Sequence, residues 1–160
     1  MSWHELEAGA PEIARLGRER LERAGIALLA TLREDGSPRI NPVEPHIVEG
    51  QLVFAAMART TKARDLSRDP RCFLHSVVSD PEGSEGELKL SGRVEERHDP
   101  ELRERPLEAW WVGRPSKQAR LFSLVIERAA FVSWDTTRGV MITRRWSPQR
   151  GFAVVERSYP

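Results

Sequence analysis

The stretch DGSPRINPVEPHIVEGQLVFAAMARTTKARDLSRDPR, residues 35–71, decides the fold. It opens with an Asp-Gly pair between two extended segments, 26–32 and 38–48, and this combination is typical of a β-hairpin. The second segment contains three prolines, Pro38, Pro42 and Pro45. Since proline cannot donate to a sheet ladder, we expect this strand to be bulged or to lie at a sheet edge. A further strand over 51–56 completes a predicted three-stranded antiparallel meander.

The segment after this meander carries the best local candidate for a binding site. A short helix is predicted over 61–68, and it ends at Asp69-Pro70 because proline disfavours helical geometry in the residue before it. The N-terminus of a helix offers unpaired N–H groups and a partial positive charge, which suit a phosphate. Two hydroxyls and three cations cluster there: Arg59, Thr60, Thr61, Lys62 and Arg64. The alternative is that Thr60 is a simple N-cap and that the cations are solvated.

The remaining segments predict one α+β, mainly β domain over residues 1–160. A helix is expected over 11–24, because Pro11 suits a first helical turn and Gly25 suits a helix end. Further strands are expected over 71–78, 88–94, 124–134, 140–145 and 152–156, with additional helices beginning at 99–100 and spanning 116–122. This order of elements predicts a closed or nearly closed antiparallel sheet with peripheral helices.

Length, charge and cysteine content exclude several classes of protein. With 160 residues the chain has the size of one domain, and its 25 basic and 24 acidic side chains create no field that attracts nucleic acid. No apolar run reaches the roughly 20 residues of a membrane helix, and the first nine residues lack the pattern of a signal peptide. A single cysteine, Cys72, cannot form an internal disulfide. We therefore expect a cytoplasmic protein without nucleic-acid or membrane partners, with Cys72 in its core.

Common catalytic signatures are missing from the sequence. It contains no Gly-rich nucleotide loop and no Gly-x-Ser-x-Gly elbow. The four histidines, His4, His46, His75 and His98, are too scattered to predict a zinc site. His75 lies within a predicted strand and is interpreted as an ordinary strand residue. The sequence therefore predicts no metal site and identifies no catalytic group.

The ordered set of elements over residues 24–96 resembles the pyridoxamine 5′-phosphate oxidase-like flavoproteins. In that family a strand of the pattern dG.P....pv is followed by l.f.T...s.K..nl..dPrv, and the corresponding residues here lie within 35–71. Agreement is weaker over residues 134–148. The resemblance implies a six-stranded antiparallel split β-barrel that forms a homodimer, with an FMN in each of two grooves between the subunits.

The resemblance also implies which residues hold the cofactor. Lys62 would bind the cofactor phosphate, with Thr60 and Thr61 donating beside it. The isoalloxazine ring would be lined by the strand backbone of Arg39, Ile40, Asn41 and Pro42, and the phosphate side would be flanked by Ala55, Ala56 and Met57. The residues themselves agree with this, because a proline-interrupted strand leaves backbone groups free for a planar ring. The alternative to a role at the ring is that Arg39 is an ordinary exposed strand residue and that Ile40 is a core residue.

The C-terminal region resembles the family less closely. The partner subunit would complete the pocket, and the resemblance points to Trp134, Arg144, Arg145 and Trp146 for this role. True pyridoxamine phosphate oxidases hold their substrate with an Arg-x-His motif near the C-terminus, whereas no histidine follows His98 here. Oxidation of a B6 vitamer is therefore not expected.

Three functional hypotheses follow from the resemblance. The leading one is an oxidoreductase that uses FMN to pass a hydride or electrons to a small molecule, with the protein supplying orientation and exclusion of water. The second keeps the enzyme class but takes a deazaflavin, whose longer acidic tail would suit three arginines, Arg59, Arg64 and Arg68. The third is a non-catalytic carrier or sensor of a flavin or of haem, in which His46 or His75 would reach the iron.

Overall fold

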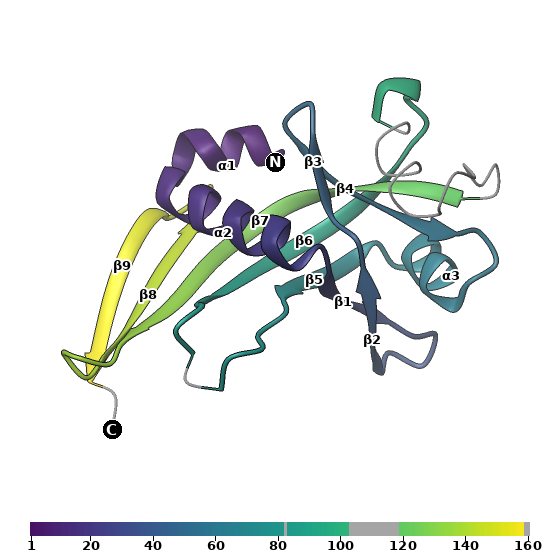
Figure 1. The fold of residues 1–160 in the computed structure, drawn as a ribbon. Helices are drawn as coiled ribbons and strands as arrows, with labels where there is room; N and C mark the ends of the chain where they lie inside the picture. The colour runs from purple at the N-terminus through teal and green to yellow at the C-terminus, as the bar shows by residue number, and fades with distance from the viewer. Residues whose placement is uncertain (82, 103–118, 159–160) are drawn as a thin grey trace.

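The computed structural model describes residues 1–81, 83–102 and 119–158 and shows one antiparallel sheet with helices packed against it (Figure 1). The labelled helices are α1 (Trp3–Gly9), α2 (Pro11–Ala24) and α3 (Thr61–Arg68). The strands are β1 (Ala27–Leu32), β2 (Pro38–Val43), β3 (His46–Val48), β4 (Gln51–Met57), β5 (Arg71–Ser76), β6 (Glu87–Arg97), β7 (Ala119–Asp135), β8 (Val140–Ser147) and β9 (Gly151–Ser158).

The strands follow the order β2-β1-β5-β6-β7-β4-β3, and β8 and β9 extend the sheet from β7. The long strand β7 connects the seven-strand path to the β8–β9 hairpin, because its first half pairs with β4 and its second half pairs with β8. The two ends of this path, β2 and β3, follow each other directly in the chain, so the sheet curls into a nearly closed barrel. The expected mainly β, antiparallel split-barrel fold is therefore confirmed.

The strand count differs from the expectation, because the described residues form nine strands and not six. The segment 38–48 is divided, since Glu44 and Pro45 separate β2 from β3 and proline has no N–H with which to continue a ladder. The C-terminal residues add the hairpin of β8 and β9. Among the described strands β2 pairs with β1 alone, which confirms its predicted edge position.

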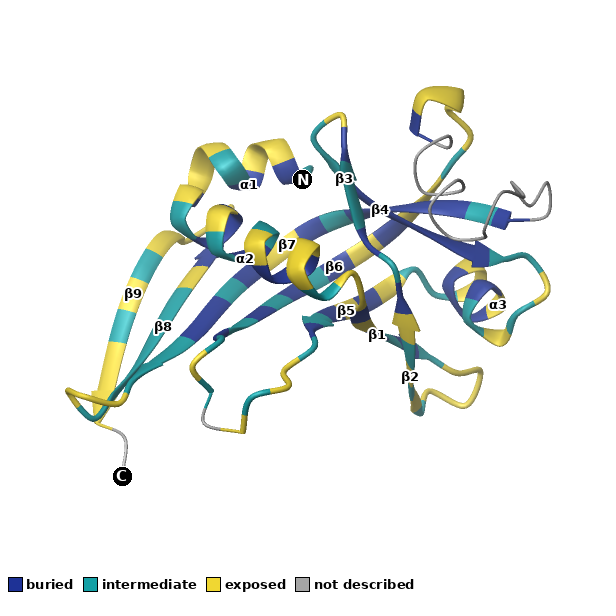
Figure 2. Cartoon of the chain, in the orientation of Figure 1, coloured by how far each residue is buried: buried dark blue, intermediate teal, exposed yellow. Residues whose placement is uncertain are grey.

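The N-terminal helices cover one face of the sheet, and their buried sides turn toward it (Figure 2). α2 has its predicted bounds and ends at Gly25, whose φ of 65° is the left-handed conformation that glycine adopts readily. α1 was not predicted; Ser2 and Glu5 form a capping box at its start, and Trp3 lies in the core. A helix of seven residues shows little hydrophobic periodicity in the sequence. The capping pair of Ser2 and Glu5 was therefore the available sequence signal for α1. None of the helices in the described residues is long and apolar enough to cross a membrane.

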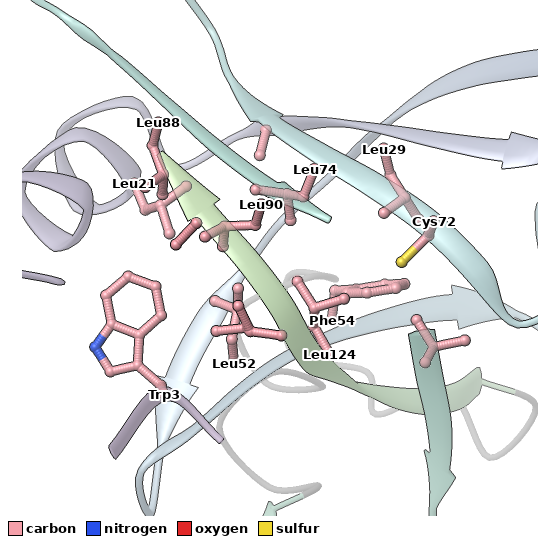
Figure 3. Close-up of a cluster of buried hydrophobic side chains, with 14 of the residues drawn as sticks. Trp3, Leu21, Leu29, Leu52, Phe54, Cys72, Leu74, Leu88, Leu90 and Leu124 are labelled. Carbon is pink, nitrogen blue, oxygen red and sulfur yellow. The ribbon is translucent and has the colours of Figure 1, made fainter. Parts of the chain in front are cut away.

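The core fills the space between these helices and the inner face of the barrel. Figure 3 shows side chains from both helices and the strands meeting in one cluster, with Trp3, Leu52, Phe54 and Leu90 among them. Cys72 belongs to this cluster, as predicted. Alternate residues of the strands point to the other face, which the N-terminal helices do not cover.

Two expected helices need correction or fall partly outside the described residues. The helix expected over 116–122 is wrong for 119–122, which begin β7. Residues 119–122 are too few to show whether the period of their apolar residues is that of a strand or of a helix, and pairing with β4 decides in favour of the strand. Residues 100–102 are helical, as expected from Asp99-Pro100. Residues 103–118, which include Trp110 and Trp111, lie outside the described residues.

Candidate functional site

The turn between β4 and α3 places the predicted binding segment at a fixed position. The Thr60 N–H donates to the Met57 carbonyl at 3.0 Å, and the Thr60 hydroxyl donates to the same carbonyl at 2.8 Å. The hydroxyl also accepts from the Ala63 N–H at 3.3 Å, so Thr60 is the N-cap of α3. The backbone N–H groups of Thr61 and Lys62 have no partner among the described residues. These two N–H groups and the exposed Thr61 hydroxyl remain available to a ligand.

Lys62 connects α3 to the edge strand β2. Its Nζ donates to the Pro42 carbonyl at 3.0 Å. Burial lowers the pKa of Lys62, and the nearby Glu44 carboxylate opposes that effect. Burial in turn raises the pKa of Glu44, against the attraction of the lysine. Lys62 is thus a half-buried cation held beside the free edge of the sheet.

The orientation of the Pro42 carbonyl fixes which backbone groups β2 presents at that edge. Because the backbone groups of alternate strand residues point the same way, those of Pro38 and Ile40 point in the same direction as those of Pro42. The two prolines have no N–H, so Ile40 supplies the one backbone donor among these three residues. The Ile40 side chain is 66% exposed, which excludes the alternative of a core residue.

A network of ion pairs behind this edge involves Asp65, which sequence reasoning missed. Arg39 donates from Nε to Oδ2 of Asp65 at 2.7 Å, and Arg68 approaches Oδ1 at 3.4 Å. The Thr31 hydroxyl lies 3.4 Å from the same carboxylate. Burial raises the pKa of Asp65, but the hydrogen bonds and charges of the two arginines outweigh it and leave the pKa below its ordinary value. Arg39 is therefore engaged in an ion pair and is not the freely exposed strand arginine of the alternative interpretation.

The other predicted site residues lie around the same junction. Asn41 points inward, and its Nδ2 is buried without a partner among the described residues. Ala56 is buried in the main core, whereas Ala55 packs with Met57 in a separate small cluster. β2, β4 and the start of α3 thus bring the ten predicted residues into one region, with Thr60 used for capping and Ala56 for the core.

A hollow of about 560 Å³ adjoins this region and includes Arg39 and Thr61 in its lining. Arg64 and Arg68 from α3 also line it, together with Arg33 from the β1–β2 turn. The side chains of Arg33 and Arg64 form no ion pair with any described residue. Asp35 and Glu34 lie at the same hollow, so the local field is mixed in sign.

The C-terminal residues take positions that the sequence did not reveal. Trp146 is buried against the end of α1, where a Cβ added at Gly9 would lie 2.8 Å from the indole nitrogen. Arg144 donates to Glu12 of α2 at 2.6 Å and to the Ser133 hydroxyl at 3.0 Å. Both therefore serve the contact between the helices and the sheet within the chain. Arg145 faces the opposite side of β8 and is exposed.

The histidines differ in how available they are to a ligand. His75 Nδ1 lies 2.6 Å from the Ser76 carbonyl, and Nε2 lies 3.0 Å from Glu87. Both ring nitrogens thus face groups of the chain itself, and neither is open to an iron ligand site. His46 Nε2 is buried without a partner among the described residues, and burial lowers the pKa of this ring.

The antiparallel sheet, curled into a nearly closed barrel, places the chain in the class of split-barrel proteins. The sequence model of the family described as Pyridoxamine 5'-phosphate oxidase matches residues 16–133, which is more than half of the chain. The chain therefore belongs to the pyridoxamine 5'-phosphate oxidase family. No curated protein matches it in sequence.

Solved structures of proteins with different descriptions have the same fold as this chain. PhzG from Burkholderia lata, in complex with tetrahydrophenazine-1-carboxylic acid, has 14% identity and a TM-score of 0.65, covering 98% of this chain and 93% of its own. A pyridoxamine 5'-phosphate oxidase-related, FMN binding protein from Nostoc punctiforme has 14% identity and a TM-score of 0.64, covering 93% and 96%. A heme binding protein from Mycobacterium smegmatis has 17% identity and a TM-score of 0.61, covering 93% and 89%. At these identities the likeness shows the fold alone.

Proposed function

We propose that the protein is an FMN-dependent oxidoreductase that transfers a hydride or electrons to a small molecule. The observation that carries this proposal is the position of Lys62, whose Nζ lies at the free edge of β2 while its N–H belongs to the open first turn of α3. A phosphate on this turn would receive a charge-assisted contact from Lys62 and hydrogen bonds from the backbone. It would also counter the burial that lowers the pKa of the lysine.

The edge of β2 fits the planar ring of the same cofactor. The Ile40 N–H would donate to a ring acceptor, and the Ile40 carbonyl would accept from a ring N–H. The unpartnered Nδ2 of Asn41 is a further donor that the fold leaves unsatisfied nearby. The flavin, when bound, supplies the hydride chemistry, and the chain binds, orients and shields it.

An apolar surface beside the edge supports a homodimer. Ile40 on β2 and Phe73 on β5 both lie opposite Ala30 of β1, so they share one face of the sheet with Leu28. Leu28 is 38% exposed and Phe73 is 39% exposed, in addition to the more exposed Ile40. Contiguous exposed apolar groups of this kind mark interaction surfaces. A second copy on this face would exclude water from the ring.

Two features leave open a deazaflavin as the cofactor of the same enzyme class. Its longer acidic tail would extend from the α3 N-terminus into the adjoining hollow. There Arg33 and Arg64 form no ion pair with the described residues and would offer charge to that tail. We favour FMN because Asp35 and Glu34 line the same hollow and would repel additional carboxylates.

Equilibrium titration of the protein with FMN, riboflavin and a deazaflavin tests the proposal. FMN is expected to bind at least tenfold more tightly than riboflavin, because riboflavin lacks the phosphate that α3 and Lys62 would hold. Preference for the deazaflavin would move the protein to the second candidate function. If none of the three binds, the oxidoreductase function is contradicted.

With its single cysteine buried, the chain needs no oxidising compartment, and we propose a cytoplasmic location.

A further inference from the structure

Arg120, near the start of β7, contacts α3 on the side away from the edge strand β2. Asp65 and Ser67 are two residues apart on this helix, so their side chains point about 200° apart around its axis. Asp65 bonds to Arg39 of β2, whereas Ser67 bonds to Arg120. The helix also packs against β1 and β4 (Figure 1). α3 is therefore held on two flanks, by β2 on one and by β7 on the other.

The contact on the β7 flank is a short chain of hydrogen bonds. Nη1 of Arg120 donates to the Ser67 hydroxyl at 2.6 Å and lies 3.4 Å from the Ala63 carbonyl. The Ser67 hydroxyl donates in turn to the same carbonyl at 2.7 Å. One guanidinium nitrogen thus reaches two positions of α3 that are one turn apart. A shift or a rotation of the helix would break both contacts.

The guanidinium of Arg120 is itself fixed in place. Nε donates to Oε1 of Glu96 at 2.8 Å and Nη2 donates to Oε2 at 2.5 Å, which is a two-point ion pair with the neighbouring strand β6. Its Cζ lies 5.2 Å from the centre of the Phe122 ring, and that ring stacks on Phe54 in the core. Arg120 thus joins α3 to a rigid part of the barrel.

The position of α3 sets the direction of the free donors in its first turn. The N–H groups of Thr61 and Lys62 point along the helix axis, as the first N–H groups of any helix do. Hydrogen bonds weaken steeply when they bend, so a tilted helix would no longer aim these donors at a phosphate. The positive charge of Arg120 near the last turn also suits the negative end of the helix dipole.

We propose that Arg120 is a positioning residue of the cofactor site. It holds α3 through Ser67 and Ala63 so that the N–H groups of Thr61 and Lys62 face the phosphate of FMN. Its hydrogen bonds within the described part of the chain go to β6 and to the first two of these helix residues, so it acts on the phosphate through the helix. This role rests on the proposed FMN-dependent function, since it concerns the phosphate of that cofactor.

The ratio of the dissociation constants of riboflavin and FMN measures this role, because the two ligands differ only in the phosphate. We expect Arg120→Gln to reduce the ratio about fivefold or more, with FMN weakened and riboflavin nearly unchanged. A role of Arg120 in stability alone would lower the folded fraction, which weakens both ligands equally and leaves their ratio as in the wild type. An unchanged ratio in Arg120→Gln would overturn the proposal.

Ser67→Ala tests the same contact from the helix. Because Ser67 is exposed, this substitution removes the hydroxyl without opening the core. We expect the ratio to fall in the same direction as for Arg120→Gln. The double variant Arg120→Gln/Ser67→Ala should lose no more than Arg120→Gln alone, because both residues act through one contact. Full additivity of the two effects would show that Arg120 does not act through Ser67 and would contradict the proposal.

Arg138→Gln is the matched control. Arg138 also forms an ion pair with a glutamate, Glu156 of β9 at 2.7 Å, but it lies just beyond the end of β7 opposite to Arg120. Arg138→Gln should keep the wild-type ratio of riboflavin to FMN dissociation constants. If it lowers the ratio as much as Arg120→Gln does, the effect does not come from α3 and the proposal is wrong.

The wild-type ratio separates this role from the proposed function. A wild type that binds FMN no more tightly than riboflavin would contradict the phosphate site at α3, and the role of Arg120 with it. A wild type that prefers FMN, together with an Arg120→Gln variant that keeps the full preference, would contradict the role of Arg120 alone and leave the FMN-dependent function standing.

Discussion

Arg39 of β2 donates a 2.7 Å hydrogen bond from Nε to Oδ2 of Asp65, a residue in the middle of α3 that is 4% exposed. This contact ties the edge strand to the helix whose first turn holds Lys62. Since Lys62 also bonds to β2 through the Pro42 carbonyl, the helix is attached to the strand at two points one turn apart. The proposed cofactor site depends on this attachment.

Asp65→Asn is therefore expected to lower both stability and FMN affinity. Asparagine keeps the shape but loses the charge that Arg39 and Arg68 face, and we expect a loss of about 1–3 kcal/mol in the free energy of unfolding. Denaturant unfolding and an FMN titration measure the two effects. The control is Glu19→Gln, whose carboxylate pairs with Arg15 on the exposed side of α2 and should change little. Equal effects of the two substitutions would contradict the positioning role of Asp65.

The stability that Asp65 contributes should disappear in acid. Its pKa is lower in the folded chain than in the unfolded chain, because the arginines favour the charged form. The contribution is thus complete above the unfolded value of about 4 and is lost as the pH falls through the lower folded value. We expect the difference in unfolding free energy between the wild type and Asp65→Asn to be constant near neutral pH and to shrink below about pH 4. A difference that grows on acidification would have the opposite sign to this account.

Cys72 should be chemically inert in the folded protein. Burial raises the pKa of its thiol to about 12, with a smaller contribution from the charge of Glu127. Because the thiolate is the reactive form, modification by a disulfide reagent at pH 8 should be slow in buffer and fast in denaturant. Stoichiometric labelling of the native protein within minutes would show that β5 opens or that the thiol is accessible.

The proposed homodimer should depend on Ile40. Ile40→Arg places a charge on the exposed apolar face, at the edge strand, without disturbing the core, since Ile40 is already mostly exposed. We expect light scattering to show twice the chain mass for the wild type and the single chain mass for the variant. Val154→Arg is the control, because Val154 is also an exposed apolar residue but lies opposite Arg144, on the helix-covered face of the sheet. A monomeric wild type would contradict the dimer.

Local signals in the sequence predicted much of the fold. Both α2 and α3 have the predicted bounds, since a proline or a capping threonine begins each and Gly25 or Asp69 ends it. The hairpin of β1 and β2 also follows from its Asp-Gly turn. These features depend on residues close together in the chain, where turn and capping preferences act directly.

The site was predicted less completely because part of it depends on distant contacts. Asp65 lies 26 residues from Arg39, and nothing in the spacing pairs them. The alignment of Lys89, Ala130 and Arg145 across three strands requires the register of β6, β7 and β8, which the sequence does not specify. The contacts of Trp146 with α1 and of Arg144 with α2 were not predicted, because they join segments far apart in the chain and α1 itself was not predicted.

The dissociation constant of FMN for Lys62→Gln, compared with that of the wild type, tests the central claim most directly. Loss of the charge-assisted contact should weaken FMN by roughly tenfold to a hundredfold, equivalent to about 1.5–3 kcal/mol, and should leave riboflavin nearly unchanged. The control Arg23→Gln, which removes a positive charge from the exposed last turn of α2, should bind FMN as the wild type does. If Lys62→Gln and Arg23→Gln both keep the wild-type affinity for FMN, the phosphate does not bind at the start of α3 and the proposed cofactor site is wrong.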